Sequence, residues 1–206
     1  KPIIGVDCWI TNDAERDKPH RVLLYCRNRT GYGQLCVLLT RAYLENKYRG
    51  RAELRADWLT PESASDLICL SGALSGEVGQ ALMNGQADTA ERLAREWAAR
   101  FPGRYYLELQ RAGHAGEELY IQSALQLAGK LELPVVATHP IQFLRPDDFQ
   151  AHEARVCIAQ GYVLADKRRP KDFTPEQYFK TQEQMCELFA DIPEALENAV
   201  EIARRC

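Results

Sequence analysis

The residues best suited to chemistry lie where a predicted strand ends, in the second half of the chain. The apolar run 134–137 predicts a buried strand of a parallel sheet. It stops at His139 and Pro140, because proline has no N–H group for a sheet hydrogen bond. His152 follows on a segment predicted to be helical from about residue 149. In β/α barrels the loops after the strands build the site, so this stretch is the first place to look for chemistry, and its imidazole groups are candidate metal ligands.

Two further residues of suitable chemistry lie on predicted strands near the start of the chain. Asp7 lies in the segment 3–10, and His20 opens the segment 20–26. Each could be a metal ligand, although a polar residue at a barrel mouth and a hydrogen-bonded histidine are the simpler interpretations. A rearranged site built from His20, His139 and His152 stays open as an alternative, because histidine is the commonest metal ligand.

The elements that must position these residues alternate between strands and helices. Apolar runs predict strands at 3–10, 20–26, 67–70, 105–109 and 134–137. Apolar residues spaced three and four apart predict helices at 35–43, 75–83, 90–101 and 117–131, and Thr60 before Pro61 predicts a further helix start. The basic segment 46–56 is predicted to be irregular. This order is typical of an α/β fold with a largely parallel sheet and helices outside it.

From Thr174 onward the pattern changes to helices alone. Thr174 to Gln177 and Thr181 to Gln184 both have the spacing of a capping box, and Pro193 suits the first turn of a last helix. We expect a single domain over 1–206, with a β/α barrel portion over 1–165 and a helical extension over 166–206 that leads to the next domain. Both ends of the sequence look like cuts in a longer protein.

Composition limits the classes of protein that fit. The 206 residues are 46% apolar and 27% charged, which is typical of a globular domain with a real core. No segment resembles a membrane span or a signal peptide, so we expect a cytoplasmic protein without membrane contact. The net charge of −3 argues against a main DNA-gripping surface. The seven cysteines are widely spaced without a Cys-x-x-Cys pair, which argues against a disulfide framework or a zinc finger.

Blocks spread over the whole chain resemble one family, in the family's own order. They are Lys1 to Gly5, His20 with Asn28 to Tyr32, Leu70 to Gly72, Tyr106 to Arg111, Leu133 to Thr138, Ala151 to Glu153 and Met185 to Leu196. Together they resemble the PHP (polymerase and histidinol phosphatase) domain of the bacterial DNA polymerase III alpha subunit, of the proteobacterial type. The resemblance implies a distorted β/α barrel that lacks its N-terminal strands here and carries extra C-terminal helices.

The resemblance also implies where metal ligands would lie, and the sequence departs from most of them. Active PHP domains bind a small cluster of metal ions through histidine, aspartate, glutamate and sometimes cysteine. The matching positions in this chain are Asp7, His20, Ala73, Pro140 and Gln142. Alanine and proline have no ligand atom, and a glutamine amide is a poor zinc ligand. We therefore expect no metal, no cofactor and no catalytic residue in this segment.

Function follows from the resemblance. It implies a parent DNA-directed DNA polymerase that works in DNA replication and uses Mg²⁺ in a domain outside this sequence. This segment is then a non-catalytic scaffold and a docking site for the proofreading exonuclease, in contact with the rest of the polymerase holoenzyme and with DNA through the parent protein. The alternative is a metal-dependent phosphoesterase or pyrophosphatase with a rearranged site. A plain DNA-binding module fits the net charge less well.

One basic run is a candidate for contact with DNA. Lys167, Arg168, Arg169 and Lys171 lie close together, with an aspartate on either side. Lysine and arginine neutralise backbone phosphates, so the run could bind DNA. The flanking aspartates make a solvated loop an equally good interpretation.

Overall fold

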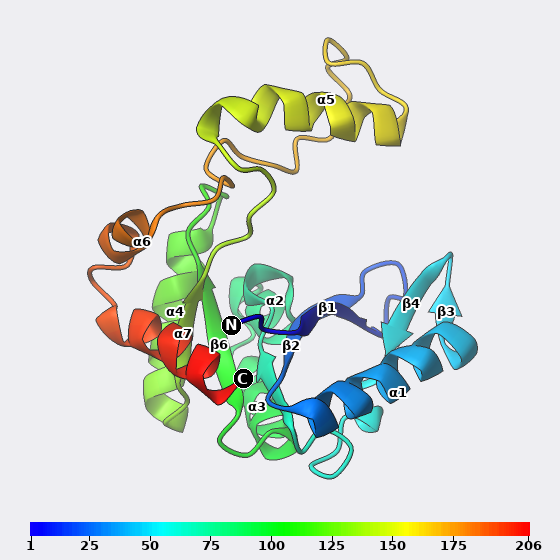
Figure 1. Cartoon of the computed structure of the whole chain (residues 1–206), viewed down its shortest axis with the longest axis vertical. Helices are drawn as coiled ribbons and strands as arrows, with labels where there is room; N and C mark the ends of the chain where they lie inside the picture. The colour runs from blue at the N-terminus through cyan, green and yellow to red at the C-terminus, as the bar shows by residue number, and fades with distance from the viewer.

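The computed structural model describes residues 1–206 (Figure 1). The strands are β1 (Gly5–Ile10), β2 (His20–Cys26), β3 (Lys47–Tyr48), β4 (Arg51–Leu54), β5 (Leu67–Leu70), β6 (Tyr105–Gln110) and β7 (Val135–Thr138). The helices are α1 (Arg29–Glu45), α2 (Glu77–Met83), α3 (Ala87–Arg100), α4 (Glu117–Leu131), α5 (Phe149–Gln160), α6 (Gln182–Leu188) and α7 (Pro193–Arg205). Short 3-10 helices lie at Ala56–Trp58, Ala73–Ser75 and Pro146–Asp148.

All the strands join one sheet in the order β3-β4-β1-β2-β5-β6-β7. β5, β6 and β7 are parallel to one another, and β1 is parallel to β4. β2 is antiparallel to both β1 and β5, and β3 is antiparallel to β4, so only β2 and β3 run against the common direction. The prediction of an α/β fold with a largely parallel sheet is confirmed. β2 departs from it because a loop, and no crossover helix, joins it to β1.

The two faces of the sheet differ because successive side chains of a strand point to opposite sides. One face packs against helices α1 to α4 in the main core, through Cys8, Ile10, Val22, Leu24, Cys69, Leu107 and Val135 among others. We call the opposite side the inner face. It bears a smaller apolar cluster in which Ile202 of α7 packs with Ile68, Leu70, Tyr106 and Val136. Asp7 and Arg21 lie on this inner face.

α7 covers the edge of the sheet at β7. Pro193 occupies its first turn, where the missing N–H group costs nothing, as predicted. The Asn198 side chain donates a hydrogen bond of 2.8 Å to the Val135 carbonyl, which satisfies an acceptor on the free edge of β7. The capping box at Thr181 and Gln184 is confirmed at the start of α6. No helix of the chain has both the length and the apolar character needed to cross a membrane.

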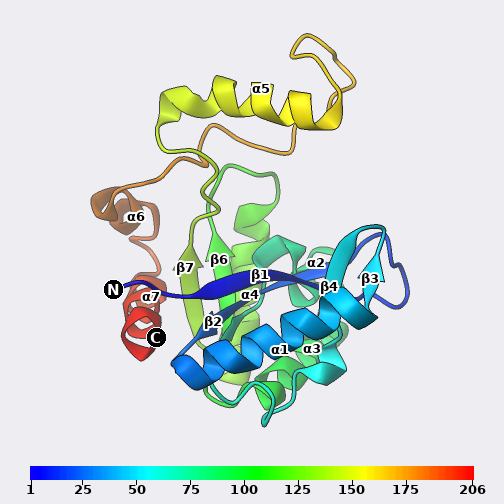
Figure 2. The same cartoon turned by 45° about the vertical axis from the view of Figure 1, so that its right-hand side comes forward.

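Helix α5 lies apart from the sheet, at the end of a protruding segment that we call the arm, residues 141–179 (Figures 1 and 2). The chain enters and leaves the arm side by side. Phe143 pairs with Tyr178 in an isolated parallel bridge, and the Gln142 N–H donates to the Gln177 carbonyl over 2.8 Å. The arm therefore has a short, hydrogen-bonded base and a helix at its far end.

Three local predictions are wrong. The segment 46–56 forms the β3–β4 hairpin, whose turn places Arg49 and Gly50 at φ 48° and 84°. No helix begins at Thr60, because the Ser63 hydroxyl accepts a hydrogen bond of 2.9 Å from the Thr60 N–H and closes a turn. Thr174 also begins a turn and no helix, since the chain there returns along the base of the arm.

Candidate functional site

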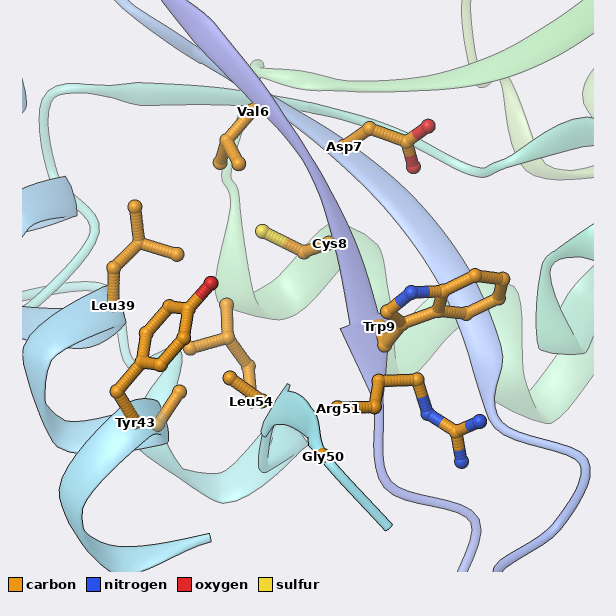
Figure 3. Close-up of a pocket in the computed structure, with 11 residues that line it drawn as sticks. Val6, Asp7, Cys8, Trp9, Leu39, Tyr43, Gly50, Arg51 and Leu54 are labelled. Carbon is orange, nitrogen blue, oxygen red and sulfur yellow. The ribbon is translucent and has the colours of Figure 1, made fainter. Parts of the chain in front are cut away.

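Asp7 lies on the inner face and is bound by an arginine. Its carboxylate accepts two hydrogen bonds from the Arg21 guanidinium. Asp7 pairs with Leu23 in the β1–β2 register, so Arg21, two positions away, is its diagonal neighbour on the same face. Figure 3 shows Asp7 on the opposite side of β1 from Val6 and Cys8, which point toward α1. The carboxylate at this ligand position is therefore already paired with a cation.

The groove in Figure 3 lies on the α1 side of β1 and has a volume of about 270 Å³. Its lining is mainly apolar, with Leu39 and Tyr43 of α1 opposite Cys8. Asp7 borders the groove but turns its carboxylate away from Leu39 and Tyr43. The groove contains no pair of groups suited to acid–base chemistry.

His20 points away from Asp7. Position alternation places it on the same side of β2 as Val22, toward the helices. Its Nε2 atom lies 3.9 Å from a carboxylate oxygen of Glu77, which in turn accepts a hydrogen bond from the Trp97 indole. The two residues that keep ligand-type side chains, Asp7 and His20, thus belong to opposite faces and do not converge on one ion.

The loop after β5 contributes no ligand and packs tightly on β2. Ala73 is buried and has a φ of 48°, a left-handed conformation that is unusual for alanine. A Cβ atom on Gly72 would lie 2.1 Å from the Arg21 carbonyl oxygen, and one on Gly76 would lie 1.7 Å from the Ser71 carbonyl oxygen. The loop and β2 meet backbone against backbone, which holds Arg21 in place.

The loop after β7 serves the base of the arm. Gln142 donates its backbone N–H to Gln177, and the Pro140 carbonyl accepts a hydrogen bond of 3.1 Å from the Gln177 side chain. His139 lies 2.8 Å through Nε2 from the Glu176 carbonyl, so Nε2 carries the proton and donates it. Burial lowers the pKa of His139 and favours this neutral form.

His152 lies inside the arm, in an aromatic environment. Its ring centroid is 5.4 Å from that of Phe143 and 4.6 Å from that of Phe173. Its Nδ1 atom lies 3.2 Å from the Arg155 guanidinium, and its Nε2 atom is buried without a partner. Burial and the charge of Arg155 lower the pKa of His152. His20, His139 and His152 have separate surroundings, so the structure does not assemble them into one rearranged site.

A polar cluster of the inner face is centred on Glu108, which is fully buried on β6. One carboxyl oxygen accepts hydrogen bonds from the Thr138 hydroxyl and, over 3.0 Å, from the Gln110 amide. The other oxygen, Oε2, has no hydrogen-bond partner. Burial raises the pKa of Glu108 above its ordinary value of 4.5, and the charge of Arg21 opposes that rise.

The basic run lies on the return loop of the arm and is partly neutralised by its own neighbours. Arg168 forms an ion pair of 2.7 Å with Asp166, and Arg169 pairs with Glu153 of α5. Lys167 and Lys171 are exposed. The arm itself uses Arg169, because that guanidinium joins the return loop to α5.

The residues at the metal positions do not fit a metal cluster. No group of three or more histidine, cysteine, aspartate or glutamate side chains is placed to hold a metal ion. Ala73 and Pro140 offer no donor atom, Gln142 belongs to the base of the arm, and Asp7 is paired with Arg21. No catalytic step through a metal ion follows from this arrangement.

Sequence reasoning missed the partner of Asp7. The alternation of side chains along 20–26 already places Arg21 opposite to His20, on the side of Leu23. The antiparallel register, which brings Arg21 beside Asp7, comes only from the structure. The strand over 105–109 was predicted, but the burial of Glu108 on it and the unpartnered Oε2 atom come only from the structure.

Comparison with known proteins agrees with this description. A family model described as "PHP domain" matches residues 1–112, which is more than half of the chain. The chain is 53% identical over 208 residues to DNA polymerase III subunit alpha of Neisseria meningitidis serogroup A. It is 43% identical over 206 residues to the protein of that name from Pseudomonas aeruginosa and 42% identical over 206 residues to the one from Escherichia coli.

Each alignment covers 100% of this chain and 18% of the relative, so the chain spans about a fifth of the length of the curated relatives it matches. The family match includes β1, β2 and the loop after β5, the segments that carry three of the five metal positions, Asp7, His20 and Ala73. The α/β sheet with outer helices is consistent with a distorted barrel of this family. This chain belongs to the PHP domain family.

Proposed function

We propose that the chain is a non-catalytic PHP domain of a replicative DNA polymerase alpha subunit, and that it works in DNA replication in the cytoplasm. Nucleotide addition with Mg²⁺ then belongs to another part of the polymerase. The domain acts as a structural scaffold and as a docking site for the proofreading exonuclease. Relatives named DNA polymerase III subunit alpha, aligned along the whole chain, support the replicative context.

The observation that carries the non-catalytic role is the state of Asp7. A carboxylate that would serve as a metal ligand is instead held by two hydrogen bonds from Arg21. His20 belongs to the other face of the sheet, and Ala73 has no donor atom. Catalytic zinc sites use three protein ligands and an open position, and this site cannot supply that set.

Docking is supported by the apolar surface of the arm. Ile158 of α5 is 82% exposed and Val163 on the following turn is 68% exposed. Exposed apolar side chains that lie close together mark protein interaction sites more often than single ones do. The arm stands apart from the sheet, so a partner can reach these side chains without a change in the barrel (Figure 1).

The first test is metal content together with hydrolysis. The chain is incubated with zinc and manganese, its metal content is measured by elemental mass spectrometry, and phosphoesterase activity is assayed in parallel. We expect no stoichiometric metal and no turnover. Two or more bound metals per chain, with hydrolysis abolished by His20→Ala, would show that the chain is a phosphoesterase with a rearranged site. Lys167→Ala, far from the barrel mouth, is the matched control.

The second test is binding to the proofreading exonuclease subunit. The chain and the exonuclease from the same organism are mixed, and the dissociation constant is measured by calorimetry. We expect a saturable one-to-one complex. An exonuclease that binds the complete polymerase but not this chain would place the docking site elsewhere and leave only the scaffold role.

A further inference from the structure

Three polar side chains, Asp7, Arg21 and Glu108, lie on neighbouring positions of the inner face. Leu23, Leu70 and Tyr106 are paired across β2, β5 and β6. Two positions further toward the barrel mouth, the same register brings Arg21 and Glu108 to one level. Between Arg21 and Glu108 the residue at this level is Gly72, just after β5, which has no side chain to separate them. On the β1 side of Arg21, Asp7 is its diagonal neighbour.

Of the carboxyl groups on either side of Arg21, Glu108 is buried and Asp7 is 45% exposed. Glu108 is fully buried, and its Oε2 atom has no partner. Asp7 and Glu108 repel each other, which contributes to the raised pKa of Glu108. A buried carboxylate without a compensating charge is strongly unfavourable, and a second carboxylate nearby makes it worse.

Arg21 supplies that compensating charge. Its guanidinium forms a two-pronged ion pair with Asp7 and is also attracted to Glu108, and both interactions raise the pKa of Arg21. Guanidinium stays protonated at any physiological pH, and its planar fork matches a carboxylate. The backbone of Arg21 is fixed by the close approach of Gly72.

We propose that Arg21 is the resident cation of this site: it takes the position in the charge balance that a divalent metal ion takes beside paired carboxylates, and it thereby closes the inner face to metal ions. The chain retains the carboxyl groups of Asp7 and Glu108, and Arg21 of β2 supplies the positive charge beside them. The site is then a specificity device that excludes divalent cations, and its function is to stabilise the sheet without a metal.

The test compares substitutions at Arg21 by thermal unfolding of the 206-residue chain, with and without millimolar Mn²⁺. Manganese is the probe because carboxylate and carbonyl oxygens suit it. We expect Arg21→Gln to lower the midpoint by about 2–4 °C, and Mn²⁺ to restore that loss. The wild-type chain and Arg21→Lys, which keep a cation, should not respond to Mn²⁺.

Two further variants show where the ion acts. Asp7→Asn combined with Arg21→Gln removes one carboxylate together with the cation, so it should not respond to Mn²⁺. Arg168→Gln breaks an exposed ion pair with Asp166 and serves as the matched control, with no midpoint shift and no response. An Arg21→Gln chain that unfolds with the wild type, or one that gains no more from Mn²⁺ than the wild type does, would overturn the proposal.

If Arg21→Gln does not fold without metal, refolding in Mn²⁺ gives the same answer. Recovery in Mn²⁺ supports the proposal, and failure to recover while Arg21→Lys also fails overturns it. The inference rests on the proposed non-catalytic function, and the two can fail separately. A wild-type chain that binds metal and hydrolyses phosphate esters contradicts both, whereas an Arg21→Gln chain indifferent to Mn²⁺ contradicts only the role of Arg21.

Discussion

Arg111 and Asp191 are 80 positions apart and form a two-pronged ion pair, with N–O distances of 2.6 and 2.9 Å. Arg111 follows β6, and Asp191 lies between α6 and α7. The same guanidinium donates to the Leu188 carbonyl over 2.6 Å and lies 5.1 Å from the centre of the Phe189 ring. One side chain thus joins the end of the sheet to the C-terminal helices.

Arg111→Ala should therefore loosen α6 and α7. The carboxylates of Asp191 and Glu118 are exposed, so their ion pairs are screened, and the main loss is the bond to Leu188 and the contact with Phe189. We expect a loss of about 1–2 kcal/mol in the free energy of unfolding, measured by urea denaturation. Arg92→Ala, which breaks an exposed pair with Glu96 within α3, should change it by less than about 0.5 kcal/mol.

Glu108→Gln should change how stability depends on pH. The folded state raises the pKa of Glu108, so the folded chain binds more protons than the unfolded chain above pH 4.5. The wild type therefore loses stability as pH rises from 4.5 through the raised value, and a glutamine does not titrate. Between about pH 5 and about pH 8, we expect the unfolding free energy of the wild type to fall relative to that of Glu108→Gln. Parallel curves for the two chains would contradict this assignment.

His152 should make the arm sensitive to acid. The pKa of His152 is lowered in the folded arm, so His152 binds a proton more readily when the arm is unfolded. Stability of the arm is then fully present above the ordinary value of 6.5 and is lost as pH falls through the lowered value. Hydrogen exchange of α5 should rise at about pH 5 relative to about pH 7.5 in the wild type and not in His152→Phe. His114→Asn is the control, because His114 lies in a loop of the main body.

Alanine substitutions at Gly72 and Gly33 test how closely the backbone is packed at these two positions. Gly72 has a φ of 78°, and a Cβ atom there would meet the Arg21 carbonyl oxygen at 2.1 Å. Gly72→Ala should cost more than about 3 kcal/mol, since neither the conformation nor the space suits alanine. Gly33 in α1 has no atom within 4 Å of the same position, and Gly33→Ala should stabilise the chain by about 0.5–1 kcal/mol. Thermal unfolding of both variants decides the matter.

The docking proposal predicts that charge on the arm weakens exonuclease binding. Ile158→Asp with Val163→Asp places two carboxylates on the exposed apolar surface of the arm. We expect the dissociation constant to rise by at least about tenfold, as loss of a central apolar contact does. Val37→Asp with Leu44→Asp is the matched control, because these side chains are 69% and 80% exposed on α1. Equal affinity for the two double variants would remove the arm from the interface.

The sequence predicts regular elements well where its pattern is regular. The predicted bounds of β2 and α4 coincide with those of the structure, because alternation and helical spacing are uninterrupted there. The hairpin β3–β4 was missed because its short strands are rich in charged residues. Arg51 and Glu53 pair with each other along β4, so their charges are satisfied within the sheet. Gly50, a residue suited to the positive φ that it adopts here, was the sequence signal for the turn.

For the site, the sequence predicted only which metal-ligand positions lack a ligand side chain. The family resemblance places Ala73, Pro140 and Gln142 at metal positions, and their side chains show without any structure that they are poor ligands or none. Which acidic group meets which cation depends on strand register and on the face to which each side chain points. Arg21 and His20 are adjacent in the sequence, yet Arg21 lies beside Asp7 on the inner face and His20 points toward Glu77 on the opposite face. A shift of the strand by one residue would exchange these two faces. Pattern alone does not supply that information.

The paired ends of the arm have a consequence for how this domain can vary. Phe143 and Tyr178 bring the two ends together, and the Phe179 N–H donates to the Phe143 carbonyl over 3.0 Å. Because both ends of the arm are fixed at one place, residues inside the arm can be inserted, deleted or replaced without moving the sheet. Each doubling of such a loop costs only about 0.6 kcal/mol in closure entropy. The arm is thus the part of the domain in which new partner specificities can arise at little cost to the barrel.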